Sequence, residues 1–156
     1  MTTKQGIAAF LVLASWCATA LAGADEVDVQ NLLDAYEQAW SQHDAIAIAS
    51  FYYEPAMRIG RGGPVVRPTR ADQEAFFTHF VPELVQRGFD HSAFEELNLH
   101  LLDADTGIAS GILLRYRKDG SLFERVAVTY GLRKGQAGWK IFLSDTHPAE
   151  TVMRFR

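Results

Sequence analysis

Three side chains near the two ends of the chain offer the clearest acid–base chemistry. Asp145 and His147 are two residues apart in a predicted last strand, so both side chains lie on one face of it. A carboxylate beside an imidazole can orient the ring as a general base. Tyr36 lies in a predicted helix, and a phenol can donate a hydrogen bond to a developing oxyanion. The spacing also suits a structural strand end, because Pro148 indicates that His147 is leaving the sheet.

Aromatic and arginine side chains are the candidates for binding a small molecule. The chain has ten Phe, five Tyr and three Trp, enough to fill a core or to line an apolar cavity. Plainer roles remain open: Tyr36 as a core aromatic, Arg58 in a solvated basic loop, and Arg115 in a cross-strand ion pair with Glu124. The predicted ligand-binding residues are Trp40, Tyr52, Arg58, Phe76, Phe80, His100, Arg115 and Tyr130.

Metal and thiol chemistry find no support in the sequence. Cys17, the one cysteine, lies in a predicted leader, so the mature domain has no thiolate ligand, cysteine nucleophile or disulfide. The sequence has no His-Glu-x-x-His motif, closely spaced histidine pair or calcium-loop cluster. We therefore predict no metal site and no cofactor.

Charge and composition narrow the class of partner. The chain has 156 residues, 48% apolar and 22% charged, which is ordinary for one globular domain. Its formal net charge of −4 becomes −5 when the leader, charged only at Lys4, is removed. Binding to nucleic acid requires clustered Lys and Arg. A mildly acidic chain therefore predicts no nucleic-acid partner.

The first 24 residues have the order of features of a secretory signal peptide. A positive charge at Lys4 precedes an uncharged, mostly apolar run over residues 6–22. Ala20-Leu21-Ala22 is a small-x-small cleavage site, with Ala24 as a second choice. We predict a leader over residues 1–22, a periplasmic or secreted protein, and no stable membrane association after cleavage. The alternative is an uncleaved anchor, although a run of about 17 residues is at the lower limit for a bilayer span.

Helical periodicity predicts how the first half of the chain positions these residues. Residues 27–43 read as an amphipathic helix, followed by a short helix over 45–50 that Asp44 can cap. A strand over 51–59 and a Gly/Pro-rich loop over 60–68 come next. The apolar side of the first helix carries Val29, Leu32, Leu33, Tyr36, Trp40 and His43, and its polar side Asp28, Gln30, Asp34, Glu37 and Gln38.

A third helix is predicted between two local signals. Thr69 and Asp72 resemble a capping box at its start, and Gly88 is a C-terminal cap. Pro82 lies inside this segment and removes a backbone hydrogen bond. The sequence therefore predicts a kink or two short helical pieces.

Alternating apolar residues and turn signals predict antiparallel strands in the second half. The strands cover residues 94–102, 108–117, 122–132 and 139–144, and Asp119-Gly120 is a strong hairpin signal. Helices followed by an antiparallel meander predict an α+β fold. One domain is expected over residues 27–148, with a C-terminal tail over 149–156.

Two segments match the order of elements in a known superfamily. Tyr36-Glu-Gln-Ala-Trp40, Asp44 and Phe51-Tyr52 follow as helix, acidic cap and first strand, and Gly138-Trp139-Lys140-Ile141 lies in the final strand. The chain resembles nuclear transport factor 2-like (SnoaL-like, ketosteroid isomerase-like) proteins, and among them uncharacterised exported members. The resemblance implies a cone, in which the helices pack in a strongly curved, mostly antiparallel sheet. It also implies a homodimer through the convex face, and the strand over 108–114, apolar on both sides, agrees.

The resemblance leaves the function open, because this superfamily includes enzymes and binding proteins alike. Tyr36 matches the hydroxyl-donating tyrosine of the ketosteroid isomerase-like branch, but the position of that branch's catalytic carboxylate falls on Gly60. We expect an exported domain that binds a small, mostly apolar molecule in the cone cavity. The alternatives are a SnoaL-like enzyme with acid–base chemistry of the dehydratase, isomerase or hydrolase type, and a non-catalytic dimeric interaction module.

Overall fold

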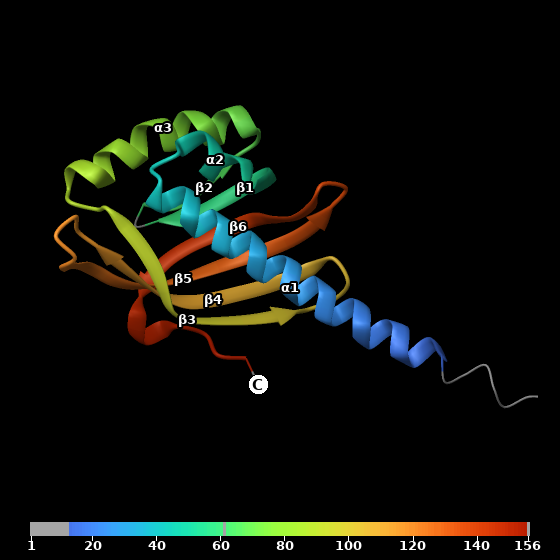
Figure 1. The fold of residues 1–156 in the computed structure, drawn as a ribbon. Helices are drawn as coiled ribbons and strands as arrows, with labels where there is room; N and C mark the ends of the chain where they lie inside the picture. The colour runs from blue at the N-terminus through green and yellow to red at the C-terminus, as the bar shows by residue number, and fades with distance from the viewer. Residues whose placement is uncertain (1–12, 61, 156) are drawn as a thin grey trace, which may run out of the picture.

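A long helix lies along the concave side of a curved sheet (Figure 1). The computed structural model describes residues 13–60 and 62–155, with side chains from residue 23 onward. Within these residues the six strands form one open sheet in the order β2-β1-β6-β5-β4-β3. β1 and β6 run parallel, and the other neighbours run antiparallel. The predicted α+β cone is therefore confirmed.

The first helix places its buried face against the sheet. α1 spans Leu13–Ser41, and Asp44 caps the short helix α2 (Ala45–Ser50) by accepting the Ala47 N–H. Val29 and Leu33 are fully buried on α1. The assignment of Glu37 to the polar side was wrong, since its side chain is only 6% exposed. Four residues after Leu33, Glu37 falls on the same helical face.

The predicted leader is not tested by the structure. Residues 1–12 lie outside the described residues, and α1 begins within the remainder of the leader. Within residues 13–60 and 62–155, no helix combines the length and the apolarity that crossing a bilayer requires. Cleavage after residue 22 or 24 stays a prediction.

The third helix is held at both ends by local backbone geometry. α3 spans Arg70–Gln86 and begins with the predicted capping box, in which Thr69 and Asp72 bond each other's backbone N–H groups. It ends with Gly88 at φ +110°, whose N–H donates to Val85 O, while Phe89 N–H donates to Leu84 O. α3 runs through Pro82 as one helix rather than two pieces.

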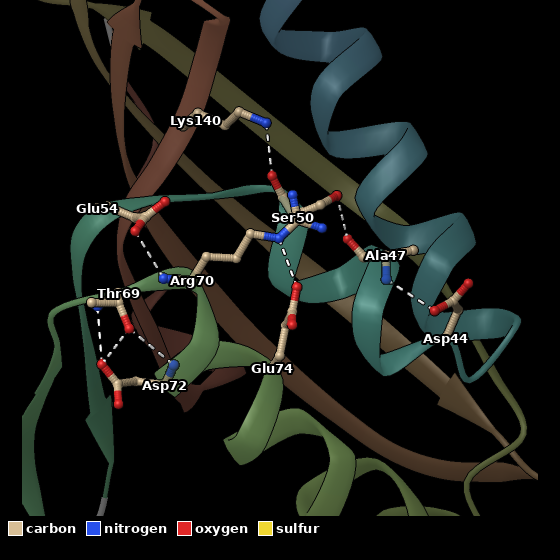
Figure 2. A network of polar contacts seen from close by, with 9 residues as sticks. All are labelled: Asp44, Ala47, Ser50, Glu54, Thr69, Arg70, Asp72, Glu74 and Lys140. Carbon is tan, nitrogen blue, oxygen red and sulfur yellow. Dashed lines mark hydrogen bonds and ion pairs between the residues drawn. The ribbon is translucent and has the colours of Figure 1, made fainter.

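Polar contacts fasten the start of α3 to its neighbours, as Figure 2 shows. The Arg70 N–H donates to Glu54 Oε2 at 2.9 Å, and Arg70 Nε donates to Glu74 Oε1 at 2.7 Å. Lys140 Nζ of the last strand donates to the Ser50 carbonyl at the end of α2, at 2.7 Å. These contacts hold α2 and α3 beside the edge of the sheet that carries β1.

The Gly/Pro-rich segment over residues 60–68 was predicted as a loop, and this was wrong. It contains strand β2, which forms an antiparallel hairpin with β1 in which Gly60 faces Gly63. Gly63 has a φ of +97°, which favours glycine at the turn. Pro64 is tolerated because β2 is an edge strand. The strands are β1 (Tyr52–Gly60), β2 (Gly63–Arg67), β3 (His91–Leu101), β4 (Thr106–Tyr116), β5 (Leu122–Gly135) and β6 (Gly138–Pro148).

The two faces of the sheet are covered by different parts of the chain. On β5, Val128, Tyr130 and Leu132 are buried on the side of α1, and Thr129 alternates to the convex side. The short helix η1 (Ala149–Thr151) and the residues up to 155 lie on the convex side; we call residues 149–155 the strap. The predicted tail is thus packed against the domain.

Candidate functional site

Three tyrosines meet inside the cone near the C-terminal end of α1. The Tyr36 ring packs edge-on against Tyr52 and Tyr130, with ring centres 5.9 and 5.8 Å apart. The Tyr36 and Tyr52 hydroxyl oxygens are 2.8 Å apart, and the Tyr52 O–H donates to Ser144 Oγ at 3.3 Å. Because Tyr52 has one proton to donate, Tyr36 is the donor to Tyr52. Burial raises the pKa of Tyr36 well above its ordinary value, so the phenol stays protonated.

A buried carboxylate lies beside this tyrosine cluster. Ser92 Oγ donates to Glu37 Oε2 at 2.7 Å, and the Tyr130 O–H donates to Glu37 Oε1 at 3.4 Å. Burial raises the pKa of Glu37, and the Ser92 hydrogen bond, the Arg115 charge and the Tyr130 hydrogen bond offset part of this effect. The Glu37 carboxyl therefore holds its proton more firmly than an exposed glutamate does.

Two hollows that share lining residues lie beside this cluster. The inner chamber, lined by Tyr36, Glu37 and Tyr130 among others, has a volume of about 30 Å³, room for about one water molecule. The mouth beyond it has about 590 Å³, within the range of about 300–1,000 Å³ typical of small-molecule sites. Both hollows are lined by Arg58, Arg115 and Thr146. A ligand body therefore fits in the mouth and not in the inner chamber.

The lining of the mouth combines apolar and cationic groups. Phe80, Leu84 and Val126 give it an apolar wall. The charged lining residues are Arg58, Arg87, Arg115 and Glu124, of which Arg115 and Glu124 form an ion pair. The Arg58 guanidinium carbon lies 4.6 Å from the centre of the Phe80 ring, close enough for a cation–π interaction.

A third hollow adjoins the mouth beneath the β1–β2 hairpin. It has a volume of about 270 Å³ and shares Arg58, Gly60 and Phe80 with the mouth. Phe76 stacks on Phe80 with ring centres 5.2 Å apart, and the Arg67 guanidinium carbon lies 3.7 Å from the Phe76 ring centre. Arg58, for which a solvated basic loop was one prediction, and Arg67 are therefore both stacked on aromatic rings.

Most of the predicted site residues converge on these hollows. Tyr36, the predicted catalytic phenol, lines the inner chamber. Phe76 and Phe80 line the hairpin hollow. The predicted ligand-binding residues that line the inner chamber are Trp40, Tyr52, Arg58, Arg115 and Tyr130.

Asp145 lines the inner chamber with Tyr36, and His147 lines the mouth, but within the described residues neither side chain forms a hydrogen bond with the Tyr36 hydroxyl. The strand register pairs Asp145 with Thr129, so the side chains of Asp145 and His147 alternate to the convex face. His147 Nε2 lies 2.8 Å from Thr129 Oγ1, and Nδ1 lies 2.6 Å from Thr151 Oγ1 on the strap. β6 includes His147, contrary to the expectation that His147 leaves the sheet. The imidazole therefore joins the strap to the convex face.

His100 also lies on the convex side. Its ring is exposed and stacks on Phe155 of the strap, with ring centres 5.5 Å apart. It lines none of the three hollows of the cone described above. The structure thus separates His100 from the other predicted ligand-binding residues.

Sequence reasoning missed Glu37, Ser92 and Ser144. The spacing of Glu37 from Leu33 and Trp40 gave a signal, because residues four before and three after it are buried on the same helix. Ser92 lies near the start of β3 and Ser144 lies within β6. Nothing in the sequence distinguishes them from other strand serines. Their roles follow from the pairing of distant strands with α1.

Metal ligation finds no cluster to support it in the part of the chain that the structure describes. No group of three or more His, Cys, Asp or Glu side chains there is arranged to hold an ion. The prediction of no cofactor remains a prediction.

Similarity to known proteins supports the fold. The family described as NTF2-like protein (DUF6841) matches residues 25–149 of the chain. Among curated proteins, none matches.

Several solved structures have a similar fold. An NTF2-like protein with a cystatin-like fold from Novosphingobium aromaticivorans has 17% identity, a TM-score of 0.74, and coverage of 91% of this chain and 93% of its own. An NTF-2 like protein of unknown function from Shewanella oneidensis has 20% identity, a TM-score of 0.63, and coverage of 78% and 98%. A domain of unknown function from Nostoc punctiforme has 16% identity, a TM-score of 0.67, and coverage of 80% and 76%. At these identities the similarity is one of fold alone.

Proposed function

Since the chain belongs to the NTF2-like protein family (DUF6841), we propose that it binds a small, mostly apolar molecule at the mouth of its cone. The observation that carries this proposal is the mouth itself. It is a hollow of about 590 Å³ with an apolar wall from Phe80, Leu84 and Val126. The inner chamber is too small for a ligand body, and its tyrosines and Glu37 supply polar groups at the floor of the site.

A blocking variant tests this proposal. Gly60 lines the mouth, and a Cβ built there meets no atom within 4 Å, so Gly60→Trp adds a large ring to the hollow without a backbone clash. We expect N-phenyl-1-naphthylamine, an uncharged fluorescent aromatic probe, to bind the unaltered protein at one site. Gly60→Trp should weaken this binding at least about tenfold, by filling the hollow that holds the probe.

A matched control adds tryptophan elsewhere. Ala104 is exposed in the turn before β4, at the opposite end of that strand from Arg115. Ala104→Trp should leave probe binding unchanged. Absence of saturable binding to the unaltered protein, both of this probe and of its anionic analogue 1-anilinonaphthalene-8-sulfonate, would contradict the ligand-binding proposal and favour a non-catalytic interaction module. Independently of the probe, native mass spectrometry of protein purified from its own periplasm identifies a natural ligand that stays bound.

A second candidate function is acid–base catalysis of the SnoaL-like type. The observation that favours it is Glu37, a buried carboxylate with a raised pKa that lies beside Tyr130 at the floor of the site. Its test is deuterium uptake from D2O into a ligand recovered from the protein. Catalysis predicts rapid uptake that Glu37→Gln abolishes, and a pure binding function predicts none. The hydrogen bonds of His147 go to Thr129 and to Thr151 of the strap, so this candidate assigns the acid–base role to Glu37.

Export and dimer formation complete the proposal. We propose that residues 1–22, or 1–24, direct export and are removed, which N-terminal sequencing of the secreted protein tests. The homodimer would form over the convex face, where Ile59, Leu143 and Met153 line a shallow hollow of about 340 Å³. Leu143→Glu should then reduce the mass measured by light scattering to that of one chain.

A further inference from the structure

We infer that the mouth selects a ligand with an anionic group, such as a carboxylate or sulfonate, attached to its apolar body. This inference rests on the proposed function and adds the chemical class of the ligand. The mouth is lined by three guanidinium groups, from Arg58, Arg87 and Arg115, and by one glutamate, Glu124. Glu124 is already paired with Arg115. The remaining charge at the site is therefore positive.

The guanidinium groups at the site are not neutralised by the described residues. Among residues 13–60 and 62–155, Arg58, Arg67 and Arg87 have no carboxylate within ion-pair distance. Other arginines of the domain do have partners, as Arg125 has in Glu95 and Arg154 in Glu96. The unpaired cations gather at the wide end of the cone, where a ligand would enter.

Aromatic rings hold two of these arginines in place. Arg58 lies over both Phe76 and Phe80, and Arg67 lies over Phe76. A guanidinium stacked on a ring still presents the N–H groups of its edge to a planar anion. The rings therefore fix the orientation of Arg58 and Arg67 without using their hydrogen-bonding capacity.

Within the described part of the chain, Arg67 has a nitrogen without a hydrogen-bond acceptor and lies near another cation, and an anion would supply both the acceptor and the opposite charge. Arg67 Nη1 is a buried nitrogen without a hydrogen-bond partner among the described residues. Burial, and then the charge of the neighbouring Arg58, lower the pKa of Arg67. An anion between the two guanidinium groups would accept the free N–H groups and offset the repulsion between like charges.

Arg58 joins the charged and apolar parts of the site. It lines the inner chamber, the mouth and the hairpin hollow. An anionic group held by Arg58 would leave the rest of the molecule against Phe80, Leu84 and Val126. The site thus fits an amphipathic anion, with its charge at the hairpin side and its body in the mouth.

Two fluorescent probes with the same aromatic skeleton test this inference on the full-length protein. 1-Anilinonaphthalene-8-sulfonate carries a sulfonate that N-phenyl-1-naphthylamine lacks. We expect the sulfonate to bind at least about tenfold more tightly, because charge-assisted hydrogen bonds to arginine add to the apolar contacts. Arg58→Gln should remove this preference, and Arg125→Gln, an exposed arginine paired with Glu95, should leave it unchanged.

The outcomes separate this inference from the proposed function. Equal binding of both probes would overturn the anion preference and leave ligand binding intact. Binding of neither probe would overturn both. If circular dichroism shows that Arg58→Gln is unfolded, Arg87→Gln, at an exposed arginine, replaces it. A preference for the sulfonate probe that persists in folded Arg87→Gln and does not change with salt concentration would overturn the inference.

Discussion

The concave and convex faces of β5 and β6 are made by alternating residues of the same strands, yet they carry different chemistry. On the concave face, Tyr130 and Ser144 meet Tyr36 and Tyr52 of other elements in a buried cluster. On the convex face, Thr129 and His147 form a hydrogen bond to each other, and His147 forms a second one to Thr151 of the strap. The concave polar groups are arranged around a hollow, whereas the convex ones fasten a chain segment. Alternation along a strand thus separates residues that are neighbours in sequence.

The largest difference in stability between a variant on the buried side and a variant on the exposed side is expected on α1. Leu33 is fully buried against the sheet, and Val27 on the same helix is 58% exposed. Leu33→Ala should lower the free energy of unfolding by about 2–5 kcal/mol through lost contacts and a cavity. Val27→Ala should change it by about 0.5 kcal/mol or less. Urea denaturation measures both, and equal effects would contradict the assigned face of α1.

The direction of the tyrosine hydrogen bonds predicts that two Tyr→Phe variants lose unequal amounts of unfolding free energy. Tyr52→Phe leaves the buried Tyr36 O–H without an acceptor and should cost about 1–3 kcal/mol of unfolding free energy. Tyr36→Phe leaves Tyr52 free to donate to Ser144 and should cost about 1 kcal/mol. Chemical denaturation of the two variants in parallel gives the order. A larger loss in Tyr36→Phe would reverse the assigned direction.

Glu37 gives the concave face a dependence of stability on pH. Because its pKa is raised in the folded state, the unfolded chain releases this proton at lower pH, and folding stability falls as pH rises above about 4.5, the ordinary value. Glu37→Gln removes this fall, so the variant gains on the unaltered protein as pH rises. At low pH the variant should be less stable by about 1 kcal/mol, because the Gln amide nitrogen cannot accept the Ser92 or Tyr130 hydrogen bond.

Unfolding at several pH values measures this difference. Glu83→Gln, which removes an exposed carboxylate of α3, is the matched control for the loss of one charge. A constant difference between Glu37→Gln and the unaltered protein across the pH range would show that the Glu37 carboxyl ionises as freely in the folded as in the unfolded chain.

The smallest effect is expected on the convex face. Arg154 of the strap makes two hydrogen bonds to Glu96, and the Met153 N–H donates to Ser110 Oγ. Glu96→Gln should speed hydrogen exchange of the Met153 amide several-fold and leave global unfolding almost unchanged, because the pair is on the surface. Glu95→Gln, at the neighbouring residue, should not affect this amide. Unchanged exchange in Glu96→Gln would mean that the ion pair does not hold the strap.

The sequence predicted the elements better than it predicted the site. Helical periodicity, the capping box of Thr69 and the Asp119-Gly120 turn are local signals, and each corresponds to the observed structure. Strand β2 was missed because its pairing with β1 outweighs the loop-like composition of residues 60–68. α3 is continuous, although a proline inside a helix usually kinks or breaks it. Pro82 and Thr78 are both exposed, so the Thr78 carbonyl that loses its hydrogen-bond partner lies on the solvent side.

The candidate site depends on which face each residue occupies, and sequence fixes this less well. Period two along β6 correctly placed Asp145 and His147 on one face, but the pattern does not say which face is concave. For Glu37, residue type suggested solvent, while its spacing from Leu33 indicated the core. In both cases the answer comes from contacts between elements distant in the chain.

The location of ligand binding is the claim on which this description of function depends. Amide chemical-shift mapping with N-phenyl-1-naphthylamine tests it directly, because Leu84 and Val126 line only the mouth, and Leu143 and Met153 line only the convex hollow. We predict shifts centred on Arg58, Leu84 and Val126, with Leu143 and Met153 unaffected. Shifts confined to Leu143 and Met153 would place the ligand on the convex face and contradict a binding site at the mouth of the cone.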